Sequence, residues 1–440
     1  MISMNGVPAL FGLALLVPVA TLGGGDDLRP PSSPESRAVA PGDPISELQA
    51  RIDAGDIELA FDSVRGYLPA LLEALEVPFS SQTLVFSRTS LQTDRIAPWA
   101  PRALYFNDDV YVGWVQESPF LEIASIHPIA GTFFFSLPQR EVDRPQFERQ
   151  GTTCLMCHES RSMTGGVAGL LMTSVLADRL GYPSTVLHEG NTTERTPFEV
   201  RWGGWYVSGT HEGFSHAGNA RSPDLNTDIQ SQPGYLEGFD LNSAGNATDL
   251  RGQFDVTPYL SEHSDIVALM VLTHQVLVHN LISLVRDEGV RDLGGPTFQK
   301  GGSREANAAA SAPALDRLVR AILFVGEPAL RGPVHGPSGF TEEFSALGPT
   351  DAQGRSLRDF DLQTRMFRYP LSFLVYSDAF DALPEFARNE IYRQLAAILV
   401  AEHPPVEFQH ISADDRGAIF EILQATKPEF RTWIGELEAG

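Results

Sequence analysis

The sequence contains very little cysteine: Cys154 and Cys157 are its only two thiols in 440 residues. There is no second cysteine pair to complete a tetrahedral zinc site of the kind that combines two such pairs. A thiol framework elsewhere in the chain is excluded for the same reason. The chemistry that cysteine performs in this protein is therefore confined to one short segment.

Positive charge is also scarce. The chain has 32 Lys and Arg against 56 Asp and Glu, which gives a formal net charge of −24 and a pI near 4.8. Nucleic acids and anionic membrane surfaces are bound by cationic faces. We therefore expect no nucleic-acid partner, and a cationic partner is favoured. Hydrophobic residues at 42% and charged residues at 20% are typical of a folded soluble protein.

Long hydrophobic runs are few. The first, Val7 to Leu22, is shorter than the ~20 residues that cross a bilayer, contains two prolines and is followed by three glycines. We interpret residues 1–23 as a signal peptide and place the protein in the periplasm or otherwise outside the cytoplasm. Because no Lys or Arg precedes the run, an uncleaved N-terminal membrane anchor is the alternative. A later run, Ile266 to Val285, is interrupted by polar residues and predicts a helix buried inside the protein.

The rest of the chain divides by composition into four parts. Residues 24–45 are rich in Pro and Ser and predict a tether. Residues 46–145 predict an N-terminal α+β region, with a helix opened by a capping box at Ser46 and Gln49 and a small antiparallel sheet. Residues 146–260 contain the two cysteines, and residues 261–440 predict a helical C-terminal region. The predicted fold class is α+β and mainly helical. The expected helices are 67–77, 265–287, 314–324, 364–376, 385–401 and 415–424; the expected strands are 83–87, 103–106, 110–115, 121–135, 185–187 and 202–208; residues 223–258 predict a loop.

The two cysteines belong to the segment Cys154-Leu155-Met156-Cys157-His158. Two thiols one helical turn apart can add to the two vinyl groups of haem, and the histidine that follows can bind the iron. In this motif and its flanks the chain resembles the c-type cytochromes. The resemblance implies one covalently bound haem c per chain, thioether bonds from Cys154 and Cys157, and His158 as the axial iron ligand. It also implies a cytochrome c-like haem region, residues 146–260, embedded in the larger chain.

The sixth iron ligand decides the class of function, because methionine raises the reduction potential, a second histidine lowers it and an open position permits catalysis. His211 and then His216 are the first candidates, since they lie in a glycine-containing segment that could approach a flat cofactor closely. Met172 and His274 are weaker candidates. The alternatives are that these histidines bind carbonyl groups or fill the core, and that Met172 is a core residue.

Electron transfer by a periplasmic single-haem cytochrome is the first functional hypothesis. The alternative is a haem enzyme, such as a peroxidase, an oxygenase or another oxidoreductase, with an open sixth position. A haem-based sensor or a structural subunit of a redox complex is the second alternative. The expected partner is accordingly a redox protein or a small-molecule substrate.

Overall fold

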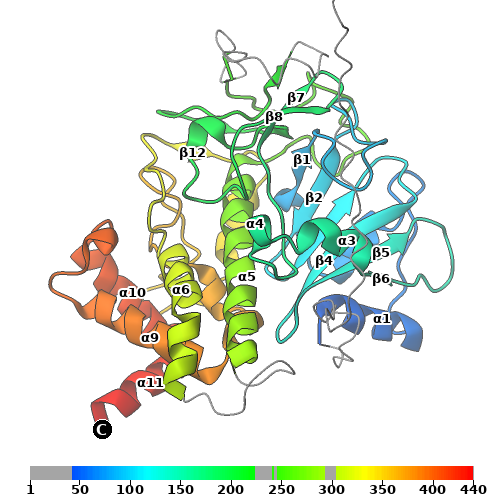
Figure 1. Ribbon diagram of the computed structural model, residues 1–440. Helices are drawn as coiled ribbons and strands as arrows, with labels where there is room; N and C mark the ends of the chain where they lie inside the picture. Colours follow the sequence, from blue (N-terminus) through cyan, green and yellow to red (C-terminus); the bar gives the residue numbers. More distant parts are fainter. Residues whose placement is uncertain (1–41, 223–239, 242–244, 293–303, 440) are drawn as a thin grey trace, which may run out of the picture.

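The computed structural model describes residues 42–222, 240–241, 245–292 and 304–439. The predicted signal peptide and nearly all of the predicted tether lie outside the described residues, as does part of the predicted loop 223–258. Figure 1 shows a β-sheet region and a helical region on either side of one long helix, α5 (Ile266–Asp292).

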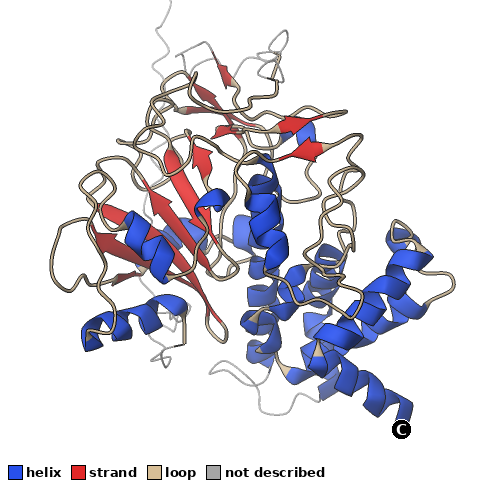
Figure 2. Ribbon diagram, turned by 180° about the vertical axis from the view of Figure 1, so that it is seen from behind, coloured by secondary structure: helices blue, strands red, loops and turns tan. Residues whose placement is uncertain are grey.

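The centre of the first region is a seven-stranded sheet in the order β6-β5-β4-β3-β2-β1-β9, with every neighbouring pair antiparallel. Figure 2 shows its strands in red beside the helices. The longest pair, β4 with β5, is a hairpin where the sequence predicted one strand, 121–135. The strands are β1 (Thr83–Val85), β2 (Arg102–Phe106), β3 (Val110–Trp114), β4 (Phe120–His127), β5 (Gly131–Pro138), β6 (Glu148–Gln150) and β9 (Trp205–Tyr206).

The two faces of this sheet are both covered. Side chains alternate between faces along a strand, so Phe134 and its cross-strand partner Ala124 face one way while Phe133 and Phe135 face the other. The Phe134 face packs in one hydrophobic core with α5, and the Phe135 face packs in a second core with α1 (Pro44–Ala54) and α2 (Leu68–Ala74). One sheet is therefore shared by two cores.

The first helix does not begin with the predicted capping box. Asp43 is the N-cap residue, and its carboxylate accepts from the backbone N–H groups of Ile45 and Ser46 at 3.1 Å. Pro44 occupies the first helical position, where its missing N–H costs nothing. The carboxylate followed by proline starts the helix two residues before Ser46.

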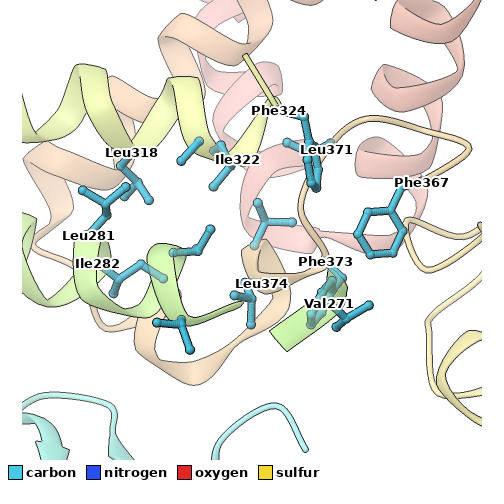
Figure 3. Close-up of a cluster of buried hydrophobic side chains, with 14 of the residues drawn as sticks. Val271, Leu281, Ile282, Leu318, Ile322, Phe324, Phe367, Leu371, Phe373 and Leu374 are labelled. Atoms are coloured by element: carbon cyan, nitrogen blue, oxygen red, sulfur yellow. The ribbon is translucent and has the colours of Figure 1, made fainter. Parts of the chain in front are cut away.

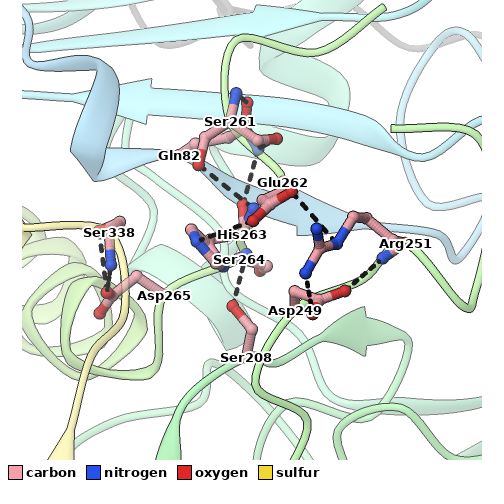
Figure 4. A network of polar contacts seen from close by, with 10 residues as sticks. All are labelled: Gln82, Ser208, Asp249, Arg251, Ser261, Glu262, His263, Ser264, Asp265 and Ser338. Carbon is pink, nitrogen blue, oxygen red and sulfur yellow. Dashed lines mark hydrogen bonds and ion pairs between the residues drawn. The ribbon is translucent and has the colours of Figure 1, made fainter. Parts of the chain in front are cut away.

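Helix α5 is buried from Ile266 to Arg286 at every residue except Leu277, as its apolar composition predicted. Its stretch Ile266–Glu288 is long and apolar enough to cross a membrane, but 94% of the most apolar window is buried inside the protein. Asp265 caps its N-terminus, accepting from the backbone N–H groups of Val267 and Ala268 and from Ser338. Figure 4 shows this cap within a larger polar network that ties the start of α5 to the sheet.

The helical region packs against the other side of α5. Figure 3 shows the core there, in which Leu281 and Ile282 of α5 meet Leu318 and Ile322 of the next helix. The predicted helix 364–376 is wrong, since only a single 3-10 turn forms at its end. The elements are α6 (Arg304–Ile322), α7 (Phe340–Ala346), η5 (Phe373–Tyr376), α8 (Asp378–Asp381), α9 (Glu385–Val400), η6 (Val406–Phe408), α10 (Ala413–Thr426) and α11 (Pro428–Ala439).

The fold is α+β, but it is not mainly helical: helix accounts for 36% and strand for 16% of the structure. The prediction of a small sheet is also wrong, because the sheet takes up β6 and β9 from beyond the predicted N-terminal region. Nor do the described residues of 146–260 form a helical cytochrome c-like unit. Their elements are β6, β9, α3 (Thr152–His158), α4 (Arg161–Thr164), β7 (Val175–Asp178), β8 (Pro183–Val186), η3 (Phe198–Val200), β10 (Thr210–His211) and β11 (Arg221–Ser222). Strand β10 pairs with β12 (Val334–His335) of the helical region. A short 3-10 helix, η2 (Phe79–Ser81), comes directly before β1.

Candidate functional site

Helix α3 carries the two cysteines and lies on the Phe134 face of the sheet (Figure 1). Leu155 is its buried residue, while Met156 is 79% exposed. Cys154 is half-buried and Cys157 is exposed, and both are free thiols. Residues three apart share a helix face, so the two thiols are presented together at the protein surface.

His158 ends α3 and is fixed by a reciprocal pair of hydrogen bonds with one residue. The backbone N–H of Gly169 donates to the His158 carbonyl at 2.8 Å, and the Gly169 carbonyl lies 2.8 Å from His158 Nδ1. A ring nitrogen beside a carbonyl carries the proton, so Nε2 is the nitrogen left for another ligand. Phe134 packs against the ring at a centroid distance of 4.5 Å.

Burial is the main cause that lowers the pKa of His158. A lowered pKa favours the neutral imidazole, which is the form that binds a metal ion. Burial likewise raises the pKa of the Cys154 thiol. The site therefore holds a neutral imidazole next to a protonated thiol.

Gly169 is held in turn by α5. The side-chain amide of Asn280 brackets the next residue, accepting from Leu170 N–H and donating to Leu170 C=O, both at 2.8 Å. A Cβ on Gly169 would come within 2.4 Å of Asn280 Oδ1. The close approach requires glycine here, and it connects the orientation of His158 to the long buried helix.

Two charged side chains lie near the same helix. Arg102 of β2 forms an ion pair with Glu122 of β4, at 2.6 Å between Nη2 and Oε2. The charges of both act on the Cys154 thiol and on the His158 imidazole. Neither Arg102 Nε nor Glu122 Oε1 makes a hydrogen bond to any residue that the structure describes, although both atoms are buried.

These residues fit a c-type haem. The thiols are free and share a helix face, Nε2 of His158 is left for a metal ion, and the nearby buried polar atoms of Arg102 and Glu122 have unused hydrogen-bonding capacity. Groups of three or more His, Cys, Asp or Glu side chains able to hold a metal ion are absent from the described residues. A haem iron does not require such a group, because the porphyrin supplies four of its ligands.

Helix α5 indicates where the predicted sixth ligands lie relative to His158. The His158 end of the site touches α5 at Asn280. Met172 is 1% exposed, and its sulfur accepts from the Thr273 hydroxyl at 3.2 Å. Thr273 is about 10 Å of helix rise from Asn280, so the Met172 sulfur is engaged in the core at a different level of α5.

His274 lies on another part of the same helix and is fully buried. Its Nε2 lies 2.8 Å from the Ser372 hydroxyl, its Nδ1 lies 3.7 Å from a Glu194 carboxylate oxygen, and its ring stacks on Phe324 at 4.2 Å. Ser372 and Phe324 belong to the helical region, and Glu194 lies between β8 and η3. His274 is therefore not brought to His158.

His211 lies at the other end of α5, whereas its neighbour His216 packs against Trp202, whose indole N–H donates to Thr273 near the middle of α5. Gly209, two residues before His211, packs against Ile266, which is about 21 Å of helix rise from Asn280. The two imidazoles are neighbours, with ring centroids 4.9 Å apart. The structure brings them to each other and not to His158.

The sequence motif identified Cys154, Cys157 and His158, but it missed the residues that support them. Nothing in the sequence around Gly169 or Asn280 indicated that the two residues meet. Their roles depend on a contact between positions that are 111 residues apart in the chain. Glu122 was predicted only as part of the strand 121–135, and Arg102 lay just before the predicted strand 103–106. An ion pair across an intervening strand follows from the register, which a single sequence does not give.

No family model, no curated protein and no solved structure matches this chain.

Proposed function

We propose that this chain is an exported, single-haem c-type cytochrome that transfers electrons to or from a redox partner. The observation that supports it most is the arrangement at α3, where two free thiols on one helix face are followed by an imidazole whose Nδ1 is engaged by Gly169. The apolar segment at residues 7–22 supports export, since covalent haem is attached in bacteria outside the cytoplasm.

Haem bound here would supply an iron that changes between the ferrous and ferric states. Cys154 and Cys157 would hold it through thioether bonds, and His158 would bind the iron. Gly169 and Asn280 orient the imidazole before any ligand arrives. Since Met156 and Cys157 are exposed, a group held on α3 is accessible to a partner protein.

A haem enzyme with an open sixth position is the second candidate. It is favoured by one observation: the four predicted sixth ligands, Met172, His211, His216 and His274, make their contacts away from His158. An iron without a protein ligand on its second face can bind a small molecule there. The two candidates share the same haem attachment and differ in the sixth position.

The attachment is tested first. The double variant Cys154→Ser/Cys157→Ser should lose all haem that resists acid-acetone extraction, while each single variant retains at most one thioether bond. Met156→Leu is the matched control within the motif, and it should keep covalent haem because its side chain is exposed. Haem that stays on the double variant, or wild-type protein without covalent haem, would contradict the proposal.

The sixth position is tested next, by optical spectra of the oxidised and reduced protein with and without carbon monoxide. A low-spin spectrum that carbon monoxide does not change supports electron transfer. A high-spin iron that binds carbon monoxide supports the enzyme. The near-infrared region then distinguishes a methionine ligand from a histidine ligand.

A further inference from the structure

The Arg102–Glu122 ion pair joins two strands, β2 and β4, that are not neighbours in the sheet. The two side chains are 20% and 16% exposed and meet above β3, the strand between their own. Gly113 lies beneath them, and a Cβ there would come within 2.6 Å of Arg102 Nη2. The pair therefore depends on a residue with no side chain at the crossing point.

The register places this pair next to the axial histidine. Glu122 pairs with Ser136 of β5, and Phe134 projects from the same face two residues earlier. Such diagonal neighbours lie roughly 7–8 Å apart. Phe134 is the residue whose ring packs against His158 at 4.5 Å.

Fold stability gives little reason for the pair. Half-buried ion pairs contribute little net stability, because desolvation offsets their attraction. Here Arg102 Nε and Glu122 Oε1 are buried without a hydrogen-bond partner among the described residues, which costs further stability. An ion pair that contributes so little to stability is better explained by its electrostatic effect on the proposed haem site beside it.

We propose that Arg102 and Glu122 set the reduction potential of the iron bound by His158, with Glu122 lowering the potential and Arg102 raising it. The two side chains act through their electric field and need not touch the iron. This inference rests on the proposed function, because it requires a haem iron at His158.

The direction follows from charge. A ferric haem carries one more positive charge than a ferrous haem, so a nearby carboxylate stabilises the ferric state and a nearby guanidinium stabilises the ferrous state. In a partly buried site these interactions are screened less than in water. Together the two charges nearly cancel, and removing either one exposes the effect of the other.

The test is potentiometric titration of the intact haem protein, followed optically at low ionic strength. At a fixed ambient potential, Glu122→Gln should raise the ratio of ferrous to ferric protein by roughly tenfold, and Arg102→Gln should lower it by a similar factor. Tenfold corresponds to 59 mV for a one-electron couple. The double variant should return most of the way to the wild-type value.

Glu390→Gln and Arg393→Gln are the matched controls, since they remove the same charges from a more exposed pair on α9, where the side chains are 33% and 60% exposed. Both should leave the potential unchanged. If a variant of the buried pair does not fold, Ser136→Asp adds a negative charge beside Glu122 and should lower the potential.

The outcomes separate the two proposals. Wild-type protein without covalent haem contradicts the proposed function. Covalent haem whose potential shifts no more in the Arg102 and Glu122 variants than in the controls contradicts this inference alone. A shift of the reduction potential in the same direction in both single variants would also overturn it. Removing opposite charges should move the potential in opposite directions, whereas a structural disturbance can move it in the same direction in both variants.

Discussion

His216 shows what burial does to a single residue in this chain. It is 5% exposed, its ring meets Trp202 edge-on at 5.5 Å, and its Nδ1 accepts from the backbone N–H of Gly218. Burial, followed by the neighbouring His211, lowers the pKa of His216 to about 3. The folded protein therefore keeps this ring neutral at pH values where the unfolded chain protonates it.

The consequence is a loss of stability in acid. Between about pH 6.5 and pH 3 the unfolded state holds a proton on residue 216 that the folded state lacks, so the free energy of unfolding falls as the pH falls. The limit is about 1.4 kcal/mol per pH unit. His216→Gln should make the dependence shallower in denaturant titrations at pH 7.5 and pH 5. His403→Gln, which changes an exposed histidine, is the control, and equal slopes in wild type and His216→Gln would refute the prediction.

At the scale of elements, asparagine side chains hold loop backbone in place by paired hydrogen bonds. Asn280 brackets Leu170 in this way from α5, next to the His158 site. Asn246 brackets His211, with both bonds at 3.1 Å, at the opposite end of α5. The same device therefore fixes His158 indirectly, through Leu170 and Gly169, and His211 directly.

These two brackets give a paired prediction. Asn280→Ala removes two buried hydrogen bonds, so it should lower the free energy of unfolding by roughly 1–3 kcal/mol and broaden the haem spectrum through a less well oriented His158. Asn246→Ala removes the same kind of bond pair at an exposed position away from His158, so it should leave the haem spectrum unchanged. One denaturation series gives both measurements: the far-UV signal reports the free energy of unfolding, and the absorption band reports the haem spectrum. A spectrum that responds to Asn246→Ala and not to Asn280→Ala would instead favour His211 as an iron ligand.

At the scale of the whole molecule, the shared sheet couples two hydrophobic cores. Leu72 of α2 is fully buried in the core on one face, and Leu281 of α5 is 3% exposed in the core on the other. If the sheet came apart, the side chains of both cores would be exposed to solvent. We therefore expect the described residues to unfold as one unit, despite a length that could hold two domains.

Cooperative unfolding is the test of this coupling. We expect a single transition, with the same midpoint by tryptophan fluorescence and by far-UV circular dichroism. Leu72→Ala and Leu281→Ala should each shift that one midpoint, by a loss of roughly 2–5 kcal/mol. Two separable transitions, each moved by only one of the variants, would show that the cores unfold independently.

The sequence by itself determined the features that depend on neighbouring residues. The spacing of Cys154, Cys157 and His158 is local, and so is the apolar composition that made α5 a buried helix. Strands β2 and β3 and helices α9 and α10 were predicted close to their observed bounds, because alternation and helical periodicity operate over a few residues. The haem motif belongs to this group, and its function stays a prediction.

Only the tertiary structure decided what those segments meet. The sheet is larger than predicted because β9, which lies within the predicted strand 202–208, pairs with β1 across more than a hundred residues, and because a strand as short as β6 carries little local signal. The same long-range packing places Arg102 and Glu122 beside His158 and carries His211 to the far end of α5. Such contacts are selected by burial and register over the whole fold, and no short window of sequence contains them.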